Sequence, residues 1–549
     1  MAKLSKLPQP GATCLPPATT DPQGKDAFVL RFGTATKEAV PTGTPPHPTN
    51  TDLTNFPDGL GTYTKALKQS LPGIVDPPTF DHFLKACGVK PSANELTKFE
   101  QPGIKLVGTA KLNGPRGAFA LQFVGKDSEG YGDPIVPAPP ALDSEAYAIE
   151  LVELYWASLL RDVPFSQYPA DATAQAAANE LTALFTAHSQ QYAGPLDGGK
   201  VTPGVLFRGG LNANPTWFAG EKEGPYLSQF CTIPTSMGRV PVDQKIRTLM
   251  PGEDFMTDMQ EWFDIQNGKP ASKTVNYDPL NRYMRTGRDT AAYTEVDELY
   301  QAYFIAYLVS VTLGIPTNPG NPYLNYVHDK AFGTFGGPDI ASTLGAVAKA
   351  ALNAVWYQKW RVHLRHRPES GGGIVQLLQT NMLNATDTAK LGNFDIVRNS
   401  GALNLSQLRY GGSFLLSQAF PDGSPTHPAY PTGHGTVGGA CITVLKFFLK
   451  GDWVFPHPVL PSVDGLTLEA YPGPEPLTVN GELHKLAHNV SFGHGIHAGI
   501  HWRSDTDYSI LLGEAFAIDF LEDQIYSYEE DFDVKITKID GSTHQFKNY

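Results

Sequence analysis

Cysteine is scarce in this chain. Only four of the 549 residues are cysteines, namely Cys14, Cys87, Cys231 and Cys441. They are too few and too widely spaced for a disulfide framework, and none shows the close spacing of zinc ligands. We therefore expect the fold to depend on a buried apolar core, with thiols that are mostly reduced. A mature extracellular protein is an alternative that the cysteine content leaves open.

Long apolar runs are also missing. The most apolar stretch, residues 304–315, is shorter than the roughly 20 residues that a membrane-spanning helix needs. The first ten residues contain two lysines with no apolar segment after them, so no secretory signal is apparent. These features favour a cytoplasmic protein without a membrane partner.

Positive charge is in the minority. The chain has 42 Lys and Arg against 55 Asp and Glu, which gives a net charge of −13. This balance argues against nucleic acid or an anionic membrane as the main partner. Any site for a small anion must therefore be a local basic pocket in an acidic protein.

Helical patterns dominate what is present. Apolar residues recur at three- and four-residue spacing in segments that we expect to be helices: 61–88, 143–162, 171–188, 251–267, 289–312, 338–364, 436–449, 482–489 and 506–526. One β-hairpin is predicted within 103–124, around Asn113-Gly114. The predicted fold is mainly α, with helical bundles closed by long Pro/Gly loops and a small β-hairpin.

The first part of the chain has a different composition from the rest. Residues 1–60 are rich in Pro, Thr and Gly and have little periodicity, which predicts an irregular N-terminal arm over the domain or over a neighbouring subunit. Residues 61–549 are predicted to form a single α-helical domain, with an anion site within 350–510.

A candidate anion site lies in the segment from Thr426 to Gly439, T-H-P-A-Y-P-T-G-H-G-T-V-G-G. Its second half looks like the start of a buried helix, whose first turn offers unpaired N–H groups and a positive dipole end. Gly433 allows an anion to approach the backbone, Thr432 adds a hydroxyl, and His434 can exchange protons with the anion. The alternative is an N-cap threonine followed by a chance histidine.

Two basic residues upstream have the chemistry of anion ligands. Lys359 and Arg367 are eight residues apart, so on an unbroken helix their side chains would not meet easily. Pro368 disfavours helical geometry at Arg367 and lets the guanidinium fold back beside the lysine. The alternative is a solvated basic end of a helix.

A third cluster, H-G-I-H-A-G-I-H-W-R-S-D, runs from His494 to Asp505. His497, His501 and Asp505 are spaced by four residues and could share one helix face. They could then hold a divalent metal such as zinc. In a second interpretation His501 is a single ligand or nucleophile whose other ring nitrogen is held by Asp505. Core histidines bonded to backbone carbonyls are the structural alternative.

The order of these three segments resembles the oxyanion signature shared by vanadium-dependent haloperoxidases, class A acid phosphatases and PAP2-type phosphatases. The likeness is greater to the algal, cyanobacterial and bacterial vanadium bromoperoxidases. It extends through L-V-E-L-Y-W-A-S-L-L-R-D-V-P-F, F-M-T-D-M-Q-E-W-F-D-I-Q-N-G, L-Y-Q-A-Y-F, F-G-T-F-G-G-P, A-V-W-Y-Q-K-W and S-P-T-H-P-A-Y-P-T-G-H. The resemblance implies two four-helix bundles, a vanadate cofactor, a structural calcium ion as an optional extra, and a homo-oligomer between dimer and dodecamer.

The resemblance also implies roles for matching positions. His501 would bind vanadium, and His434 would be the acid/base residue beside the apical oxygen. Lys359 would in addition polarise bound peroxide. The remaining oxygens would be held by Lys359, Arg367, Thr432 and the Gly433 N–H.

Further positions match the surroundings of the cofactor. Asp505 would orient His501, while Trp356 and His427 would line the halide side. A histidine at position 427 resembles the bromoperoxidase pattern rather than the chloroperoxidase one. The residues expected to act in catalysis are therefore His434, Lys359 and His427.

Two positions depart from the family pattern. Thr432 stands where a serine is usual, which keeps the hydroxyl and adds a methyl group. The usual second arginine, six residues before the ligand histidine, is replaced by Gly495. With a one-residue insertion in this segment, His494 would take that place and join the vanadate-binding residues.

Three functions are compatible with these residues. The first is a vanadate-dependent haloperoxidase that oxidises bromide, and potentially chloride or iodide, with hydrogen peroxide to a hypohalous acid that halogenates small organic acceptors. The second is a phosphatase that uses the same pocket, with His501 as nucleophile and His434 as acid. The third is a catalytically weakened oxyanion-binding homologue that has lost the arginine.

Overall fold

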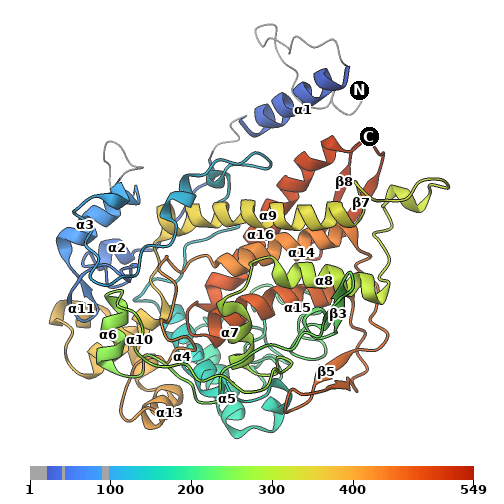
Figure 1. Cartoon of the computed structure of the whole chain (residues 1–549). Coiled ribbons are helices and arrows are strands. Elements are labelled where there is room, and N and C mark those ends of the chain that lie inside the picture. Colours follow the sequence, from blue (N-terminus) through green and yellow to red (C-terminus); the bar gives the residue numbers. More distant parts are fainter. Residues whose placement is uncertain (1–21, 40–43, 89–97) are drawn as a thin grey trace.

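The computed structural model describes residues 22–39, 44–88 and 98–549. Within these ranges the protein is mainly helical, as predicted (Figure 1). The α-helices are α1 (Pro22–Ala39), α2 (Asp52–Asn55), α3 (Pro77–Ala86), α4 (Glu145–Leu160), α5 (Ala172–Ala187), α6 (Met259–Gln266), α7 (Gly287–Glu295), α8 (Gln301–Leu313), α9 (Gly337–Tyr357), α10 (Pro368–Gln379), α11 (Ala385–Lys390), α12 (Asp395–Arg398), α13 (Gly401–Arg409), α14 (Gly433–Phe448), α15 (Val479–Phe492) and α16 (Arg503–Gln524).

Helix α14 is the centre of the core. All its residues are buried, and it packs against α9, α15 and α16, which run beside it in Figure 1. Small residues make the contact with α16 close. A Cβ added at Gly439 would lie 2.0 Å from the Ile510 carbonyl oxygen, and one at Gly513 would lie 2.1 Å from that of Thr436. Larger side chains at these two glycines would push the helices apart.

Several predicted helices begin at the cap that the sequence indicates. Ser144 caps α4 by accepting a hydrogen bond from the Tyr147 N–H, and Asp171 caps α5 by accepting one from Ala174. The helix predicted over 289–312 is instead two helices, α7 and α8. The break between them allows Asp297 to turn its side chain towards α14, where it meets His434.

The predicted hairpin around Asn113-Gly114 is wrong. Gly114 does turn the chain, with φ +58°, but it opens the 3₁₀ helix η3 (Pro115–Phe119). Pro115 has no N–H for a strand ladder and suits the first position of a helix, which explains the outcome. The strands form four antiparallel pairs elsewhere: β1 (Gln69–Leu71) with β2 (Ile74–Val75), β3 (Thr235–Met237) with β4 (Val240–Val242), β5 (Val459–Pro461) with β6 (Leu468–Ala470), and β7 (Asp533–Thr537) with β8 (Thr543–Lys547).

The N-terminal region also differs from the prediction. Residues 1–21 and 40–43 of the expected arm lie outside the described residues, as does Cys14. Between them, Pro22–Ala39 form helix α1, which stands apart from the body in Figure 1. A proline near its start and the run A-F-V-L-R-F favour this helix over an irregular arm. In the segment 61–88, which was predicted to be helical, only α3 is an α-helix.

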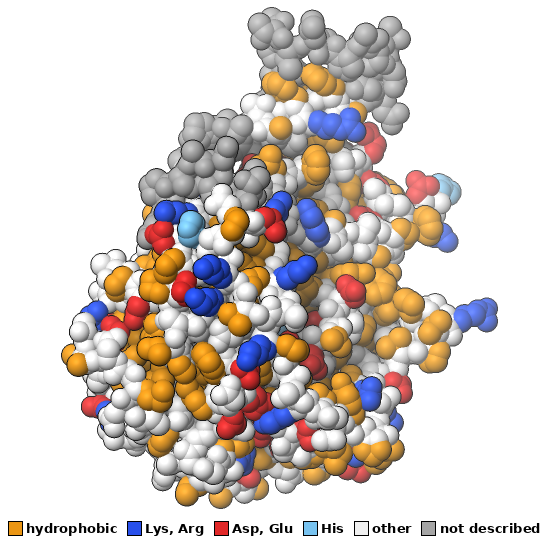
Figure 2. All heavy atoms as spheres, turned by 60° about the vertical axis from the view of Figure 1, so that its left-hand side comes forward, with side chains coloured by type: hydrophobic (Ala, Val, Ile, Leu, Met, Phe, Trp, Pro, Cys, Tyr) orange, Lys and Arg blue, Asp and Glu red, His pale blue; other side chains and the backbone are white. Residues whose placement is uncertain are grey.

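The surface charges and the state of the cysteine thiols agree with the composition of the chain. On the face shown in Figure 2, basic and acidic side chains are interspersed, and no continuous basic surface is seen. None of the described helices is long and apolar enough to cross a bilayer. Cys87, Cys231 and Cys441 are buried and free, as expected for the described part of the chain.

Candidate active site

Lys359 and Arg367 reach the same loop from two sides. Lys359 lies on a π-helical turn, η8 (Gln358–His363), and Arg367 is the extended residue before Pro368, the first residue of α10. Lys359 Nζ donates hydrogen bonds to the carbonyl oxygens of Pro428 and Ala429, at 2.9 and 2.6 Å. Arg367 Nε donates to the carbonyl oxygen of His427 at 2.9 Å. The predicted effect of Pro368 on the backbone of Arg367 is confirmed, because Arg367 is extended, with φ −86° and ψ 155°.

The loop ends at the N-terminus of α14. Thr432 is the N-cap residue, and Gly433 is the first residue of the helix. The Thr432 hydroxyl does not cap the helix, and Thr432 Oγ1 is buried without a hydrogen-bond partner. A buried hydroxyl without a partner is costly, so this atom has the property expected of an unused anion ligand.

His501 lies two residues before α16, so it does not share a helix face with Asp505 as predicted. The two side chains nevertheless meet, because His501 Nδ1 donates to Asp505 Oδ2 at 2.9 Å. With its proton on Nδ1, the neutral ring has a lone pair on Nε2, and Arg367 donates to that atom at 2.8 Å. Burial and the charges of Arg367 and Lys359 hold the pKa of His501 well below its usual value. His501 therefore presents a neutral nitrogen donor to the basic pocket.

His434 and His494 stack on each other at the side of the pocket. Their ring centroids are 3.8 Å apart, and the planes differ by 28°. His434 Nε2 lies 3.0 Å from Asp297 Oδ1, and His494 Nδ1 lies 3.1 Å from the carbonyl oxygen of Thr294. The Asp297 carboxylate therefore fixes the orientation of the His434 ring.

The placement of His494 depends on a second π-helical turn, η10 (Gly493–His497). A π turn holds one more residue than an α turn. The extra residue is consistent with the predicted one-residue insertion, by which His494 would take the position of the usual arginine. His494 and His501 are neighbours, with ring centroids 5.9 Å apart.

His427 and Trp356 form the remaining wall. Their rings are 4.7 Å apart, and Arg367 Nη2 lies 2.9 Å from His427 Nδ1. Burial, followed by the charges of Arg367 and Lys359, holds the pKa of His427 well below its usual value. The wall is thus an aromatic surface with a neutral imidazole beside Arg367 and Lys359. Burial, followed by the charge of Arg367, holds the pKa of Lys359 well below its usual value.

Comparison with known proteins agrees with this geometry. No family model matches the chain. The chain is 32% identical to the vanadium-dependent bromoperoxidase of Corallina pilulifera, over 91% of this chain and 92% of that protein. It is also 32% identical to the vanadium-dependent bromoperoxidase of Ascophyllum nodosum, over 94% of this chain and 91% of that protein. The chain belongs to the vanadium-dependent bromoperoxidase family. The homohexameric second vanadate-dependent bromoperoxidase of Ascophyllum nodosum has the same fold, with a TM-score of 0.83, 29% identity, and coverage of 100% of this chain and 96% of that chain.

The residues of the pocket fit the cofactor in the family's name. Vanadate is an anion with several oxygens and accepts a nitrogen ligand. Arg367 supplies positive charge, Lys359 supplies an amine donor, Thr432 Oγ1 lacks a partner, and Gly433 begins a helix. His501 supplies a nitrogen whose lone pair faces these groups.

The zinc interpretation of the histidine cluster is wrong. The ring of His497 contacts Phe165 and Phe207, and its Nε2 lies 2.8 Å from the Tyr226 hydroxyl. Burial, with nearby arginines, lowers the pKa of His497 to about 3. Among the residues that the structure describes, no three His, Cys, Asp or Glu side chains are gathered as a metal site would need.

Two charged residues near the pocket were not anticipated from the sequence. Asp297 lies in a segment that was predicted to be helical throughout, so nothing indicated that it turns inward. Arg365 was passed over as one of several basic residues in R-V-H-L-R-H-R, yet it is buried and donates to Asp505. Its position two residues before Arg367, in an extended segment, was the available signal.

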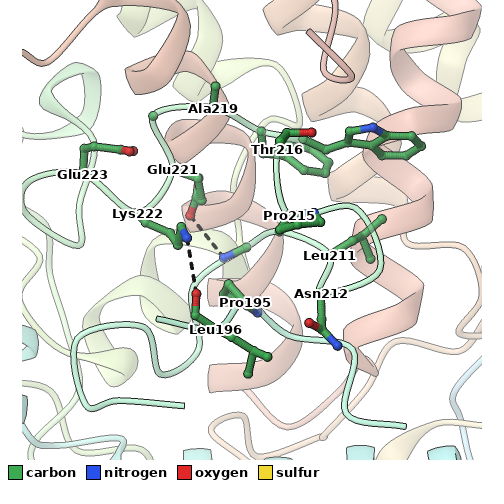
Figure 3. A pocket seen from close by; sticks show the side chains of 15 residues that line it. Pro195, Leu196, Leu211, Asn212, Pro215, Thr216, Ala219, Glu221, Lys222 and Glu223 are labelled. Carbon is green, nitrogen blue, oxygen red and sulfur yellow. Dashed lines mark hydrogen bonds between the residues drawn. The ribbon is translucent and has the colours of Figure 1, made fainter. Parts of the chain in front are cut away.

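A separate cavity of about 380 Å³ lies between residues 195–196 and 209–223 (Figure 3). Lys222 Nζ donates to the Leu196 carbonyl oxygen across it, and Glu221 accepts from the Gly209 N–H. Glu221 Oε2 also lies 3.3 Å from His488 Nδ1. The other ring nitrogen of His488, Nε2, lies 3.3 Å from Asp507 Oδ1. This cavity shares no lining residue with the pocket of His501.

Proposed function

We propose that this protein is a vanadate-dependent bromoperoxidase that uses hydrogen peroxide to oxidise bromide to hypobromous acid, which then halogenates small organic acceptors. The observation that carries the proposal is the neutral His501 nitrogen facing a buried basic pocket that contains a hydroxyl without a partner. Bound vanadate would supply Lewis-acid activation of peroxide towards attack by the halide, without a change in its oxidation state.

The residues of the chain would bind the cofactor and transfer protons. Lys359, Arg367, the Thr432 hydroxyl and the N–H groups at the start of α14 are arranged to hold anionic oxygens. We assign His494 to the same group, because it lies beside His434 and His501. The burial of these groups strengthens their attraction for an anion, because little water competes with them.

His434 is the group placed to move protons. Its Nε2 is held by Asp297, so the other ring nitrogen, Nδ1, is available to the pocket. The carboxylate orients the ring for proton transfer, and general acid/base groups typically contribute about 10²- to 10⁴-fold to a rate. Peroxide activation requires such a proton acceptor.

His427 and Trp356 favour a peroxidase over a phosphatase. They place an aromatic wall and a neutral imidazole next to Lys359 and Arg367, which suits a small halide better than a large hydrated phosphate ester. Membership of the bromoperoxidase family points the same way. We retain bromide as the proposed halide.

One assay separates the functions. Metal-free protein is supplied with hydrogen peroxide, bromide and a phenol dye, with and without added vanadate, and a phosphate-ester assay is run in parallel. Bromination that depends on vanadate and is inhibited by phosphate supports the proposal. Phosphate-ester hydrolysis without bromination would assign a phosphatase, and absence of both reactions would assign a binding homologue.

We also propose that the protein is a homo-oligomer. The structurally similar Ascophyllum protein is homohexameric, and α1 stands apart from the body with Phe28 and Phe32 stacked on each other (Figure 1). A second copy would cover this helix. Light scattering of the full chain and of a variant that lacks residues 1–43 tests this, because an unchanged mass would exclude α1 from the interface. A structural calcium ion remains a prediction.

A further inference from the structure

Arg365 links three segments of the chain beneath the pocket. Its Nη1 donates to Asp505 Oδ1 at 2.7 Å and to Ser504 Oγ at 2.9 Å, while its Nη2 donates to Glu150 Oε2 at 3.0 Å. The side chains of Arg365 and Asp505 are 1% and 0% exposed, and that of Glu150 is 7% exposed. Glu150 also accepts from the Ser504 N–H at 2.8 Å, in the first turn of α16. The guanidinium is therefore fixed at both ends.

The second oxygen of Asp505 belongs to the site. Asp505 Oδ2 accepts from His501 Nδ1 at 2.9 Å and from the Trp502 N–H at 3.0 Å. A continuous chain of contacts thus runs from Glu150 through Arg365 and Asp505 to His501. None of its members has another role in the pocket except His501.

The orientation of the Asp505 carboxylate depends on Arg365. Two buried carboxylates share one guanidinium, and the loss of that cation would leave two buried negative charges close together. The two carboxylates would then repel each other, and Asp505 Oδ1 would lose the donor that fixes its orientation. Asp505 Oδ2 would no longer be held in place to accept the hydrogen bond from His501 Nδ1.

We infer that Arg365 is a positioning residue that, with Glu150, holds the Asp505 carboxylate directed at His501, and thereby sets how tightly His501 binds vanadate. This inference rests on the proposed vanadate site. Groups that orient a metal-binding histidine typically change metal affinity by about 10- to 100-fold when they are removed. Arg365 acts through Asp505, so we expect a loss of about tenfold or more.

The chain contains a matched control. Arg503 of α16 and Glu153 of α4 form another buried ion pair, with an Nη2 to Oε1 distance of 2.6 Å and side chains 1% and 2% exposed. It joins the same two helices that Arg365 bridges. Arg503 donates to the carbonyl oxygen of Arg208, and its ion pairs are with Glu153 and Asp507 rather than with Asp505. Substitution of Arg503 therefore breaks an equally buried ion pair without touching the link to His501.

The experiment measures vanadate binding to the metal-free protein by calorimetry, together with the melting temperature. Lysine in place of Arg365 keeps the charge but cannot bridge Asp505 and Glu150 with a planar fork. We expect Arg365→Lys to weaken vanadate binding by about tenfold or more. Arg503→Lys should lower the melting temperature and leave the vanadate Kd close to the wild-type value.

A double-mutant cycle tests whether Arg365 acts through Asp505. In an Asp505→Asn background, Arg365→Lys should have little further effect on the Kd. If Arg365→Lys does not fold, the pair Glu150→Gln and Glu153→Gln replaces the two lysine variants. Glu150→Gln removes one anchor of the guanidinium and should weaken binding, whereas Glu153→Gln should not.

Three results would count against these ideas, and they are distinguishable. Wild-type protein that binds no vanadate refutes the proposed function itself. The positioning role alone is overturned if the wild-type protein binds vanadate and Arg365→Lys has the same Kd. The same holds for Glu150→Gln where that variant is used. A general effect of destabilisation would be shown instead if Arg365→Lys and Arg503→Lys lost equal amounts of vanadate affinity. The same conclusion would follow if the effects of Arg365→Lys and Asp505→Asn on the Kd were additive.

Discussion

Arginine introduced at position 494 or at position 495 tests how the π-helical turn η10 completes the pocket. In the family pattern the second arginine lies six residues before the ligand histidine, which is Gly495 here. We propose that the extra residue of the π turn instead gives this place to His494, which stacks on His434. We therefore expect His494→Arg, and not Gly495→Arg, to restore the missing cation.

The expected changes in vanadate affinity follow from the surroundings of positions 494 and 495. A charge-assisted hydrogen bond contributes roughly 1.5 to 3 kcal/mol, so His494→Arg should tighten vanadate binding by about 10- to 150-fold. A Cβ at position 495 would lie 3.1 Å from His501 Cβ, closer than the roughly 3.5 to 4.0 Å of a good carbon contact. Gly495→Arg should therefore displace His501 and weaken binding. Gly495→Ala, which adds the Cβ without the charge, is the matched control and should also weaken it.

Calorimetric titration of vanadate into each metal-free variant gives the four Kd values, including the wild type. Melting temperatures measured on the same samples report any loss of folded protein. If Gly495→Arg tightened binding while His494→Arg did not, position 495 would be the true equivalent of the family arginine. The role given to the π turn would then be refuted.

The sequence predicted the parts of the site that depend on local rules. The start of α14 was predicted within a few residues, at 436 rather than at Gly433, because the residues before it are typical of helix starts. Pro368 likewise determined that Arg367 leaves the helix. Long buried helices such as α4 were predicted within a few residues of their observed bounds.

The parts that failed depend on tertiary contacts. The hairpin around Gly114 was predicted from a turn signal, but the strand partners of that segment were absent and Pro115 began a 3₁₀ helix. The two π turns, η8 and η10, break the 3.6-residue period at the positions of Lys359 and His494. A pattern based on a constant period cannot anticipate an extra residue, and such turns occur frequently at functional sites. The inward turn of Asp297 depends on its contact with His434, which lies far away in the sequence.

The remaining predictions concern histidines inside and outside the pocket. His501→Ala should abolish vanadate binding and His497→Ala should retain it, and calorimetry that showed equal losses would contradict the assignment of a single ligand. His434→Ala should bind vanadate but lose about 10²- to 10⁴-fold in bromination rate, whereas wild-type turnover would exclude its acid/base role. His488 should make stability depend on pH, because burial opposes its charge but its two carboxylate partners outweigh burial and raise its pKa to about 9. A raised pKa means that this stabilisation is complete below about pH 6.5, the unfolded value, and is lost as the pH rises towards 9, a change of about 3 kcal/mol. The melting temperature of the wild type should therefore fall over this range relative to that of His488→Gln, and parallel curves for the two proteins would show that His488 is not charged in the folded state.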